Sequence, residues 1–187
     1  MRSLAALIIV AILAGGTGDA SSYVIDFEGY PSGTQITDQY LSYGVLFSGY
    51  PPGESPPMTE DYGAGSYGSV LRSHDWYSAM RIEFVDPLNP TFYLPVSHIE
   101  FDNPIDSEVD YIAVEVFDAS GQLLYSYTST SPERVIIDLG APVAAYMILD
   151  DTANTAYVID NLETDSPIVF FDGFESGDVS AWSATVP

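Results

Sequence analysis

The sequence predicts an all-β protein, and more specifically an antiparallel β-sandwich of the jelly-roll type. Short runs of alternating apolar and polar residues recur along the chain, and Gly, Pro, Asn and Asp residues separate them. No window shows apolar residues at helical spacing. About ten such strands joined by close turns are typical of two packed antiparallel sheets. The predicted strands cover residues 23–27, 44–48, 69–73, 80–85, 96–102, 111–118, 122–128, 134–139, 145–150 and 156–162.

The clearest alternation lies in residues 111–118, YIAVEVFD, where Ile112, Val114 and Val116 share one face of the predicted strand. The segment DASGQ separates this run from the next apolar run. It predicts a tight hairpin turn in which Gly121 takes a positive φ angle.

Residues 48–68, SGYPPGESPPMTEDYGAGSYG, interrupt the strand pattern. Proline cannot donate to a strand ladder and glycine weakens a strand, so this segment predicts a long loop on one rim of the sandwich. Binding residues concentrate on loops held by a rigid scaffold. Aromatic residues lie in or just after this loop, namely Tyr50, Tyr62, Tyr67, Trp76 and Tyr77.

The aromatic residues near this loop predict a ligand-binding site. Flat amphipathic rings stack on sugar faces, while the neighbouring Asp75 is placed to accept hydrogen bonds from sugar hydroxyl groups. The candidate ligand-binding residues are Trp76, Tyr77, Asp75 and Tyr62. In the alternative interpretation, these aromatic residues pack the long loop onto the rim of the sandwich.

The first 20 residues have the layout of a secretory signal peptide: Arg2, an apolar stretch from Leu4 to Leu13, and the small residues GGTGDA. The apolar stretch is too short to cross a bilayer, which takes roughly 20 residues, and no later segment is long and apolar enough. We expect cleavage after Ala20, with Gly16 as the alternative, and a secreted or cell-surface bacterial protein. The expected layout is a signal peptide over residues 1–20, a β-sandwich domain over 21–163, and a linker with a C-terminal tail over 164–187.

The composition is strongly acidic and lacks cysteine. The chain has 27 Asp and Glu residues against 4 basic residues, which gives a formal net charge of -23, and it contains no lysine. Such a charge disfavours binding to nucleic acid or anionic lipid and favours cations. Because disulfides are absent from a chain expected to be exported, the core and a bound metal are the remaining means of stabilisation.

Three acidic residues form a candidate metal site. Alternation places Asp26 and Glu28 on one face of the first strand and sends Phe27 to the other face. In the last strand Ile159 and Leu162 both resemble core residues although they are three apart, which predicts a bulge at Asp160 and Asn161. Calcium binds carboxylate and carbonyl oxygens, so Asp26, Glu28 and Asp160 could bind Ca²⁺ and join the first strand to the last. The alternative is that these acids face solvent.

The segment DFEGYPSGTQITDQYLSYGVLFSG, together with VIDNL at Val158 to Leu162, resembles a largely uncharacterised family of exported bacterial β-sandwich domains. The likeness covers Tyr23 to Leu162. The acidic first strand and the Asp of the last strand are also similar to the structural calcium arrangement of jelly-roll carbohydrate-binding modules, which implies calcium ligands at Glu28 and Asp160. No segment matches the sugar-binding residues of such a module.

The C-terminal segment VFFDGFESGDVSAWS resembles a short segment found at the ends of otherwise unrelated exported bacterial proteins. This resemblance implies a portable tail that a sorting or surface-attachment system reads, with Thr164 to Pro167 as the linker. The alternatives are an added edge strand over residues 168–174, whose Phe170 and Trp182 pack on the sandwich, and the start of a second domain.

No catalytic residue is predicted. The sequence has no G-x-S-x-G segment, no cysteine, no zinc signature H-E-x-x-H and no glycine-rich phosphate loop. We therefore expect a secreted, non-catalytic, calcium-stabilised module whose partner is an extracellular glycan or a cell-surface component. A structural or adhesive surface protein without a small ligand is the main alternative, and a glycan-active hydrolase with paired carboxylates is the second.

Overall fold

The computed structural model describes residues 23–61, 68–75, 77–104, 112–129, 131–151 and 157–165. The predicted signal peptide, Tyr62, Trp76 and the C-terminal tail after Asp165 lie outside these residues. Among the described residues, no helix is long and apolar enough to cross a membrane.

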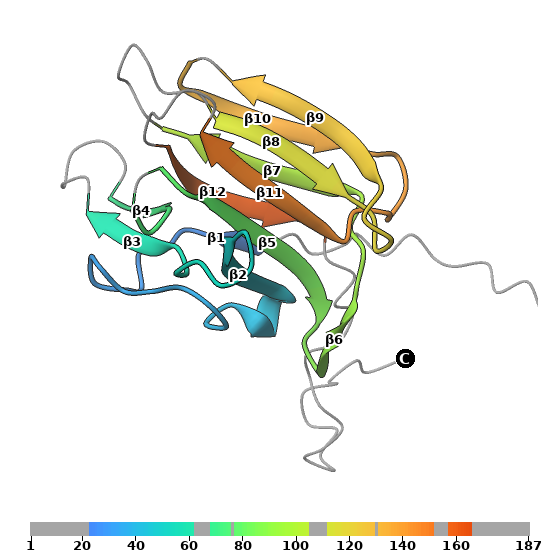
Figure 1. Cartoon of the computed structure of the whole chain (residues 1–187), viewed down its shortest axis with the longest axis horizontal. Coiled ribbons are helices and arrows are strands. Elements are labelled where there is room, and N and C mark those ends of the chain that lie inside the picture. The colour runs from blue at the N-terminus through green and yellow to red at the C-terminus, as the bar shows by residue number, and fades with distance from the viewer. Residues whose placement is uncertain are drawn as a thin grey trace, which may run out of the picture.

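The chain folds into two antiparallel sheets that pack face to face (Figure 1). One sheet has the order β10–β7–β12–β4–β3, with β1 also paired to β12. The other has the order β2–β5–β11–β8–β9, with β6 also paired to β5. The elements are β1 (Tyr23–Ile25), the 3-10 helix η1 (Leu41–Tyr43), β2 (Val45–Tyr50), β3 (Met58–Asp61), β4 (Ser69–Arg72), β5 (Ala79–Asp86), β6 (Asn89–Tyr93), β7 (His98–Asn103), β8 (Ile112–Phe117), β9 (Leu123–Ser129), β10 (Glu133–Asp138), β11 (Tyr146–Asp151) and β12 (Val158–Thr164).

The connections between these strands are those of a jelly roll. From β4 to β12, the chain crosses from one sheet to the other at nearly every step, and β8–β9 and β5–β6 are pairs of consecutive strands that stay in one sheet. The orders β4–β12–β7–β10 and β5–β11–β8–β9 are those expected of two interlocked Greek keys. The predicted all-β fold and the predicted sandwich architecture are confirmed.

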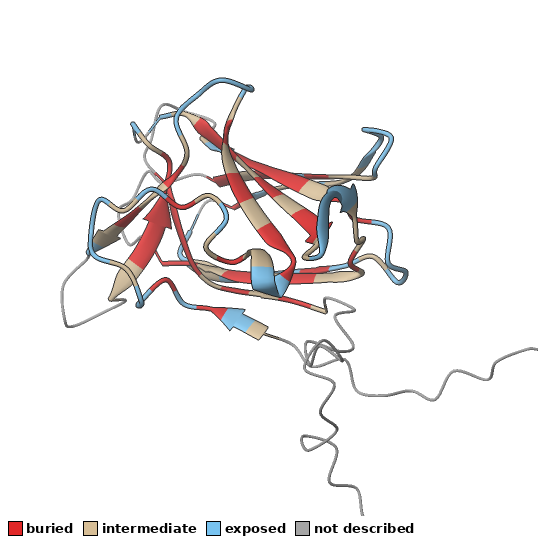
Figure 2. Cartoon of the chain, turned by 90° about the horizontal axis from the view of Figure 1, so that it is seen from below, coloured by how far each residue is buried: buried red, intermediate tan, exposed pale blue. Residues whose placement is uncertain are grey.

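Apolar side chains from both sheets form one buried cluster. Buried residues accordingly recur along the strands of both sheets (Figure 2). The alternation predicted for β8 is confirmed, because Ile112, Val114 and Val116 are fully buried while Glu115 is exposed. Burial of one such side chain stabilises the fold by about 1.5–3 kcal/mol. The largest fully buried side chains are those of Tyr157, Phe27, Phe84, Phe101, Ile36, Leu71, Met80, Ile82, Ile99, Ile112, Ile137 and Met147.

The opening D-F-E segment places its phenylalanine in the core. Strand β1 ends at Ile25, and Phe27 turns inward with a φ angle of 56°. Its ring packs edge-on against those of Tyr40 and Phe47, at centroid distances of 5.6 and 6.0 Å. Asp26 and Glu28 on either side of it are exposed. The predicted division of the segment into an inward and an outward face is confirmed, although the strand itself is shorter than predicted.

The prediction of one long loop over residues 48–68 is wrong in part. Strand β2 continues to Tyr50, and Met58–Asp61 form strand β3, which pairs with β4. Met58–Asp61 contain neither proline nor glycine, so they can form a ladder although prolines precede them. Residues 33–36 also bond to this region, since the Gly33 amide donates to the Thr59 carbonyl at 2.7 Å.

The predicted bulge in the last strand is confirmed. Asn161 has a φ angle of 50°, and the pairing of β12 with β7 shifts register between Asp160 and Glu163. Ile159 and Leu162 on either side of the bulge are both fully buried. The bulge therefore lets two residues that are three apart face the same core.

Candidate functional site

A surface cleft lies at one end of the sheet that contains β2, β5 and β11. Its volume is about 350 Å³. Its lining combines aromatic and acidic side chains from two loops and three strand ends, and consists of Tyr50, Pro51, Glu54, Asp75, Tyr77, Ser78, Ala79 and Asp150. The pairing of β2 and β11 with β5 brings these strand ends together, since Tyr50 is opposite Ala79 and Leu149 is opposite Met80.

The first wall is the loop that follows β2. Its backbone packs directly on the strand at Gly49, where a Cβ atom would lie only 2.3 Å from the Ser55 carbonyl oxygen and 2.6 Å from that of Glu54. The Glu54 amide donates to the Pro51 carbonyl at 3.1 Å and closes a turn. Glycine at position 49 is therefore required for the loop to approach β2 this closely.

The second wall is the turn that precedes β5. The carboxylate of Asp75 accepts hydrogen bonds from the amides of Tyr77 and Ser78, at 3.1 and 2.8 Å. Hydrogen bonds from Ser78, followed by that from the Tyr77 amide, lower the pKa of Asp75. Asp75 is consequently ionised at neutral pH, and it also shapes the turn that presents Tyr77.

Two side chains hold this turn against the sandwich. The buried Tyr157 hydroxyl shares its one proton between the Leu149 carbonyl of β11 at 2.8 Å and the Ser78 carbonyl at 3.1 Å. The guanidinium of Arg72 donates to the carbonyls of Ser73 and His74, at 2.8 and 2.7 Å. The wall is therefore fixed by hydrogen bonds to the neighbouring strands before any ligand arrives.

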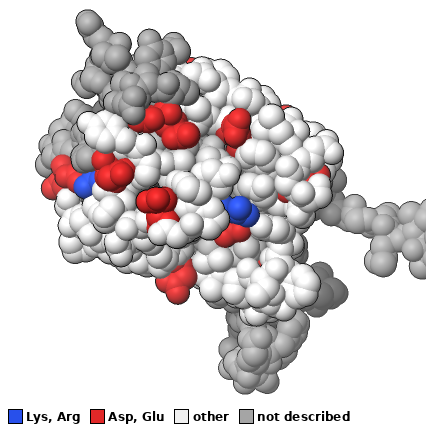
Figure 3. Space-filling model, viewed as in Figure 1, with Lys and Arg blue, Asp and Glu red and all other residues white. Residues whose placement is uncertain are grey.

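The cleft is acidic. Glu54, Asp75 and Asp150 belong to its lining, which includes no basic residue. Burial raises the pKa of Asp150, and the negative charge of Glu115 raises it further. On the molecular face drawn in Figure 3, acidic atoms likewise outnumber basic ones. The site thus attracts hydrogen-bond donors and positive charge and repels anions.

The structure places two of the four predicted ligand-binding residues in this cleft. Tyr77 is 58% exposed, so its ring is open to a ligand, and Asp75 lies two residues before it. Trp76 and Tyr62 lie outside the described residues. A role for these residues in glycan binding stays a prediction. Sequence reasoning did not find two acidic residues of the lining, Glu54 and Asp150. Asp150 could not be found because it reaches the cleft only through the pairing of β11 with β5.

The three residues predicted to bind calcium meet elsewhere, where β12 lies beside β1 and β4. Asp160 is only 5% exposed. Burial raises its pKa to about 6, and the charges of Asp102, Glu28 and Asp26 also raise it. Asp160 is therefore close enough to the other three carboxylates to be repelled by them. In the described part of the chain, however, no three His, Asp or Glu side chains are arranged as a set of metal ligands.

The same carboxylates accept hydrogen bonds from neighbouring amides. Glu28 accepts from the Ser69 amide at 2.9 Å, and Asp26 accepts from the Glu28 amide at 3.2 Å. The side-chain amide of Asn161 donates to Asp102 at 2.8 Å and to Asp160 at 3.2 Å. Asn161 therefore lies between two carboxylates and reduces their repulsion in part.

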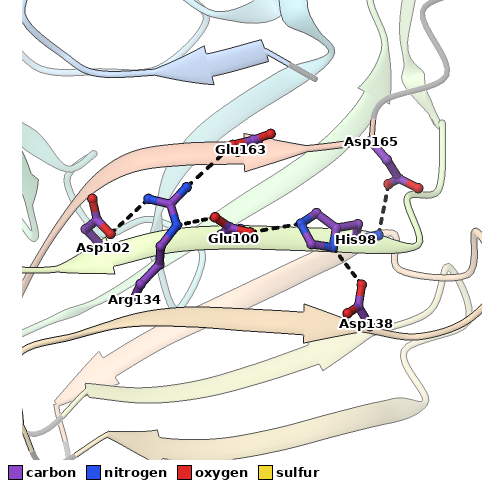
Figure 4. A network of polar contacts seen from close by, with 7 residues as sticks. All are labelled: His98, Glu100, Asp102, Arg134, Asp138, Glu163 and Asp165. Atoms are coloured by element: carbon purple, nitrogen blue, oxygen red, sulfur yellow. Dashed lines mark hydrogen bonds and ion pairs between the residues drawn. The ribbon is translucent and has the colours of Figure 1, made fainter. Parts of the chain in front are cut away.

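A polar network covers the outer face of β7, β10 and β12 (Figure 4). The His98 ring lies 2.6 Å from a carboxylate oxygen of Asp138 and 3.2 Å from one of Glu100. Arg134 contacts Glu100 and pairs with Asp102 at 3.0 Å. The hydrogen bond with Asp138, and then its charge and the contacts with Glu100, raise the pKa of His98 although burial lowers it. This network joins strands that are adjacent in the sheet but distant in sequence.

The chain was compared with known proteins. No protein-family model matches it, and no curated protein matches its sequence. Among solved structures, the K2 cleaved adhesin domain of Lys-gingipain matches with a TM-score of 0.50 and 11% identity, over 77% of this chain and 99% of that one. A mutant of the family 29 carbohydrate-binding module CBM29-2 complexed with cellulohexaose matches with a TM-score of 0.41 and 12% identity, over 76% of this chain and 90% of that one.

The fold and the cleft together define the class of this chain as a β-sandwich module with a preformed surface cleft. The likeness to the adhesin domain supports the sandwich fold, and at 11% identity it shows the fold alone.

Proposed function

We propose that the chain is a non-catalytic module of an exported bacterial protein that binds an extracellular or cell-surface glycan. The cleft is the observation that supports this proposal. Tyr77 and Tyr50 offer rings for stacking, and Asp75, Glu54 and Asp150 offer acceptors for sugar hydroxyl groups. Because hydrogen bonds already fix the turn that carries Asp75 and Tyr77, little ordering free energy is lost on binding.

The experiment that tests this proposal is a screen of the exported chain on a glycan array, followed by calorimetric titration of the best oligosaccharide. Tyr77→Ala should weaken binding about tenfold or more, because a ring that lines a binding site and stacks on the ligand carries a large share of the binding free energy. Phe92→Ala is the matched control, since Phe92 is 62% exposed and lies outside the cleft lining. Equal loss in both variants, or in neither, would contradict the proposal.

A structural or adhesive role without a small ligand is the second candidate. Leu88 and Phe92 are 84% and 62% exposed, and both belong to the hairpin formed by β5 and β6. Large exposed apolar side chains on a protruding hairpin favour a protein contact. If this role is the correct one, Phe92→Ala should reduce attachment of the protein to cells while Tyr77→Ala leaves attachment unchanged.

A glycan-active hydrolase is the least supported candidate. The pKa of Asp75 is lowered and that of Asp150 is raised, as in pairs of catalytic carboxylates. We assign Asp75 to shaping the turn instead, because Oδ1 of its carboxylate accepts two backbone hydrogen bonds. Prolonged incubation with the oligosaccharide that binds best should therefore release no shorter product.

We also propose that Ca²⁺ binds where Asp26, Glu28 and Asp160 meet. Support comes from the position of Asp160, a carboxylate that is only 5% exposed. Burial raises its pKa, and the charges of Asp102, Glu28 and Asp26 raise it further. Since the described side chains do not form a closed ligand set, binding would require Asp26 and Glu28 to rotate. Calcium should raise the melting temperature relative to chelator, and Asp160→Ala should abolish that rise. Equal melting with calcium and with chelator in the wild type would contradict a calcium site.

A further inference from the structure

We propose that the ligand of the cleft is a cationic glycan, a polymer of amino sugars that carry free ammonium groups. This inference rests on the proposed glycan-binding function and narrows it to one chemical class of ligand. Three features of the cleft support it: its acidic lining, the lack of an arginine among its lining residues, and its two tyrosine rings.

The acidic side chains come from three separate parts of the chain and meet in one cavity. Glu54 comes from the loop after β2, Asp75 from the turn before β5, and Asp150 from the end of β11. The cavity of about 350 Å³ is large enough for one or two sugar rings. A neutral glycan would leave the charge of these carboxylates unbalanced, whereas an ammonium group would neutralise it.

No arginine of the described part of the chain belongs to the cleft lining. Arg72 pairs with Glu60 at 3.0 Å, Arg81 pairs with Glu83 at 2.9 Å, and Arg134 pairs with Asp102 at 3.0 Å. The sequence contains no lysine. An anionic glycan such as a polyuronic acid would therefore meet repulsion from the cleft and from the net charge of -23.

The aromatic residues distinguish a sugar from a simple cation. Tyr50 and Tyr77 line the same cleft as the carboxylates, and Tyr77 is 58% exposed. A tyrosine ring stacks on the apolar face of a sugar and also attracts an ammonium group that approaches its own face. Rings and carboxylates together match an amino sugar, which presents an apolar face and a positive charge on the same ring.

The test compares hexasaccharides that differ in charge, by calorimetric titration of the full exported chain at low salt. The probes are the hexamer of glucosamine, the hexamer of N-acetylglucosamine, cellohexaose and hexagalacturonate, with hexalysine as a cationic peptide. The glucosamine hexamer should bind at least about tenfold more tightly than the other four, and its affinity should fall as salt screens the charges. The double substitution Glu54→Gln with Asp150→Asn should remove this preference while the melting temperature stays unchanged.

The matched control is Asp38→Asn with Asp86→Asn, which removes the same charge from residues outside the cleft lining and should leave the preference intact. If the N-acetylated hexamer or cellohexaose binds as tightly as the glucosamine hexamer, the inference is wrong and the proposed function stands. If hexalysine binds as tightly, the cleft recognises cations in general and the inference is again wrong. If no oligosaccharide binds, the proposed function and the inference both fail.

Discussion

Phe27 and Asn161 are non-glycine residues with positive φ angles, 56° and 50°. Each of these backbone conformations fixes the orientation of the acidic residues next to it in sequence. Such a conformation costs of order 1–3 kcal/mol. At Phe27 full burial of the ring offsets this cost and leaves Asp26 and Glu28 facing outward. At Asn161 the bulge places Asp160 in a buried position beside Asp102. Two local backbone conformations thus account for the cluster of carboxylates near β12.

The charge on Asp160 destabilises the folded protein at neutral pH. Its folded pKa of about 6 is higher than the value of about 3.9 expected in an unfolded chain, so the native state binds the proton more tightly. The free energy of unfolding should therefore fall as pH rises from about 4 to about 6. Asp160→Asn should raise the free energy of unfolding by about 2 kcal/mol at pH 7.5 in chelator and change it little at pH 4.

Urea denaturation at the two pH values measures this effect. Asp160→Asn keeps an oxygen that accepts from the Asn161 backbone amide but removes the one that accepts from the Asn161 side-chain amide at 3.2 Å, so the comparison reports the charge together with one long hydrogen bond. A variant that is less stable than the wild type at pH 7.5 would show that the carboxylate makes a favourable contact, and would contradict the account.

At the scale of the strands, His98 makes the stability of the sheet dependent on pH. Its ring links β7 to β10 through Asp138, and this contact raises its pKa above the usual 6.5. The protonated ring stabilises the folded state fully below pH 6.5, and this contribution is lost as pH rises through the folded pKa. His98→Gln should therefore flatten the decline in unfolding free energy above pH 6.5.

Two comparisons check this prediction by denaturation at several pH values. Asp138→Asn should also flatten the decline, because it removes the main cause of the raised pKa of His98. Glu133→Gln serves as the control, since Glu133 lies on the same strand and bonds to Tyr127 rather than to His98. An unchanged slope in His98→Gln would show that another group titrates in this range.

The strands were largely predictable from sequence and the cleft was not. Alternation specifies which face of a strand is buried, so the burial of β8 and the bulge in β12 followed from residue spacing. Strand β3 was missed because four residues between proline- and glycine-rich segments carry too short a pattern. In the cleft, Asp75 and Tyr77 are neighbours in sequence and were found together. Asp150 belongs to the site only because β11 pairs with β5, and pairing cannot be read from alternation.

At the scale of the whole molecule, the jelly-roll connections explain why a cleft forms where it does. Antiparallel pairing brings the end of β2, the start of β5 and the end of β11 together at the same end of one sheet. The loops that extend from these strand ends then form the two walls. The chain is rich in acidic residues, and three of them, Glu54, Asp75 and Asp150, give the cleft a negative electrostatic potential. Fold and composition thus jointly favour a ligand that carries hydroxyl groups and positive charge.

The most direct test of the binding site is amide hydrogen exchange of the full chain, with and without the oligosaccharide that binds best. Bound ligand should slow exchange in residues 50–55, 77–79 and 149–151, the segments that contain lining residues of the cleft, and should leave the outer face of β7 and β10 unchanged. Protection confined to these three segments would confirm the cleft as the binding site. Protection on the β5–β6 hairpin or on the outer face of β7 and β10 instead would contradict it.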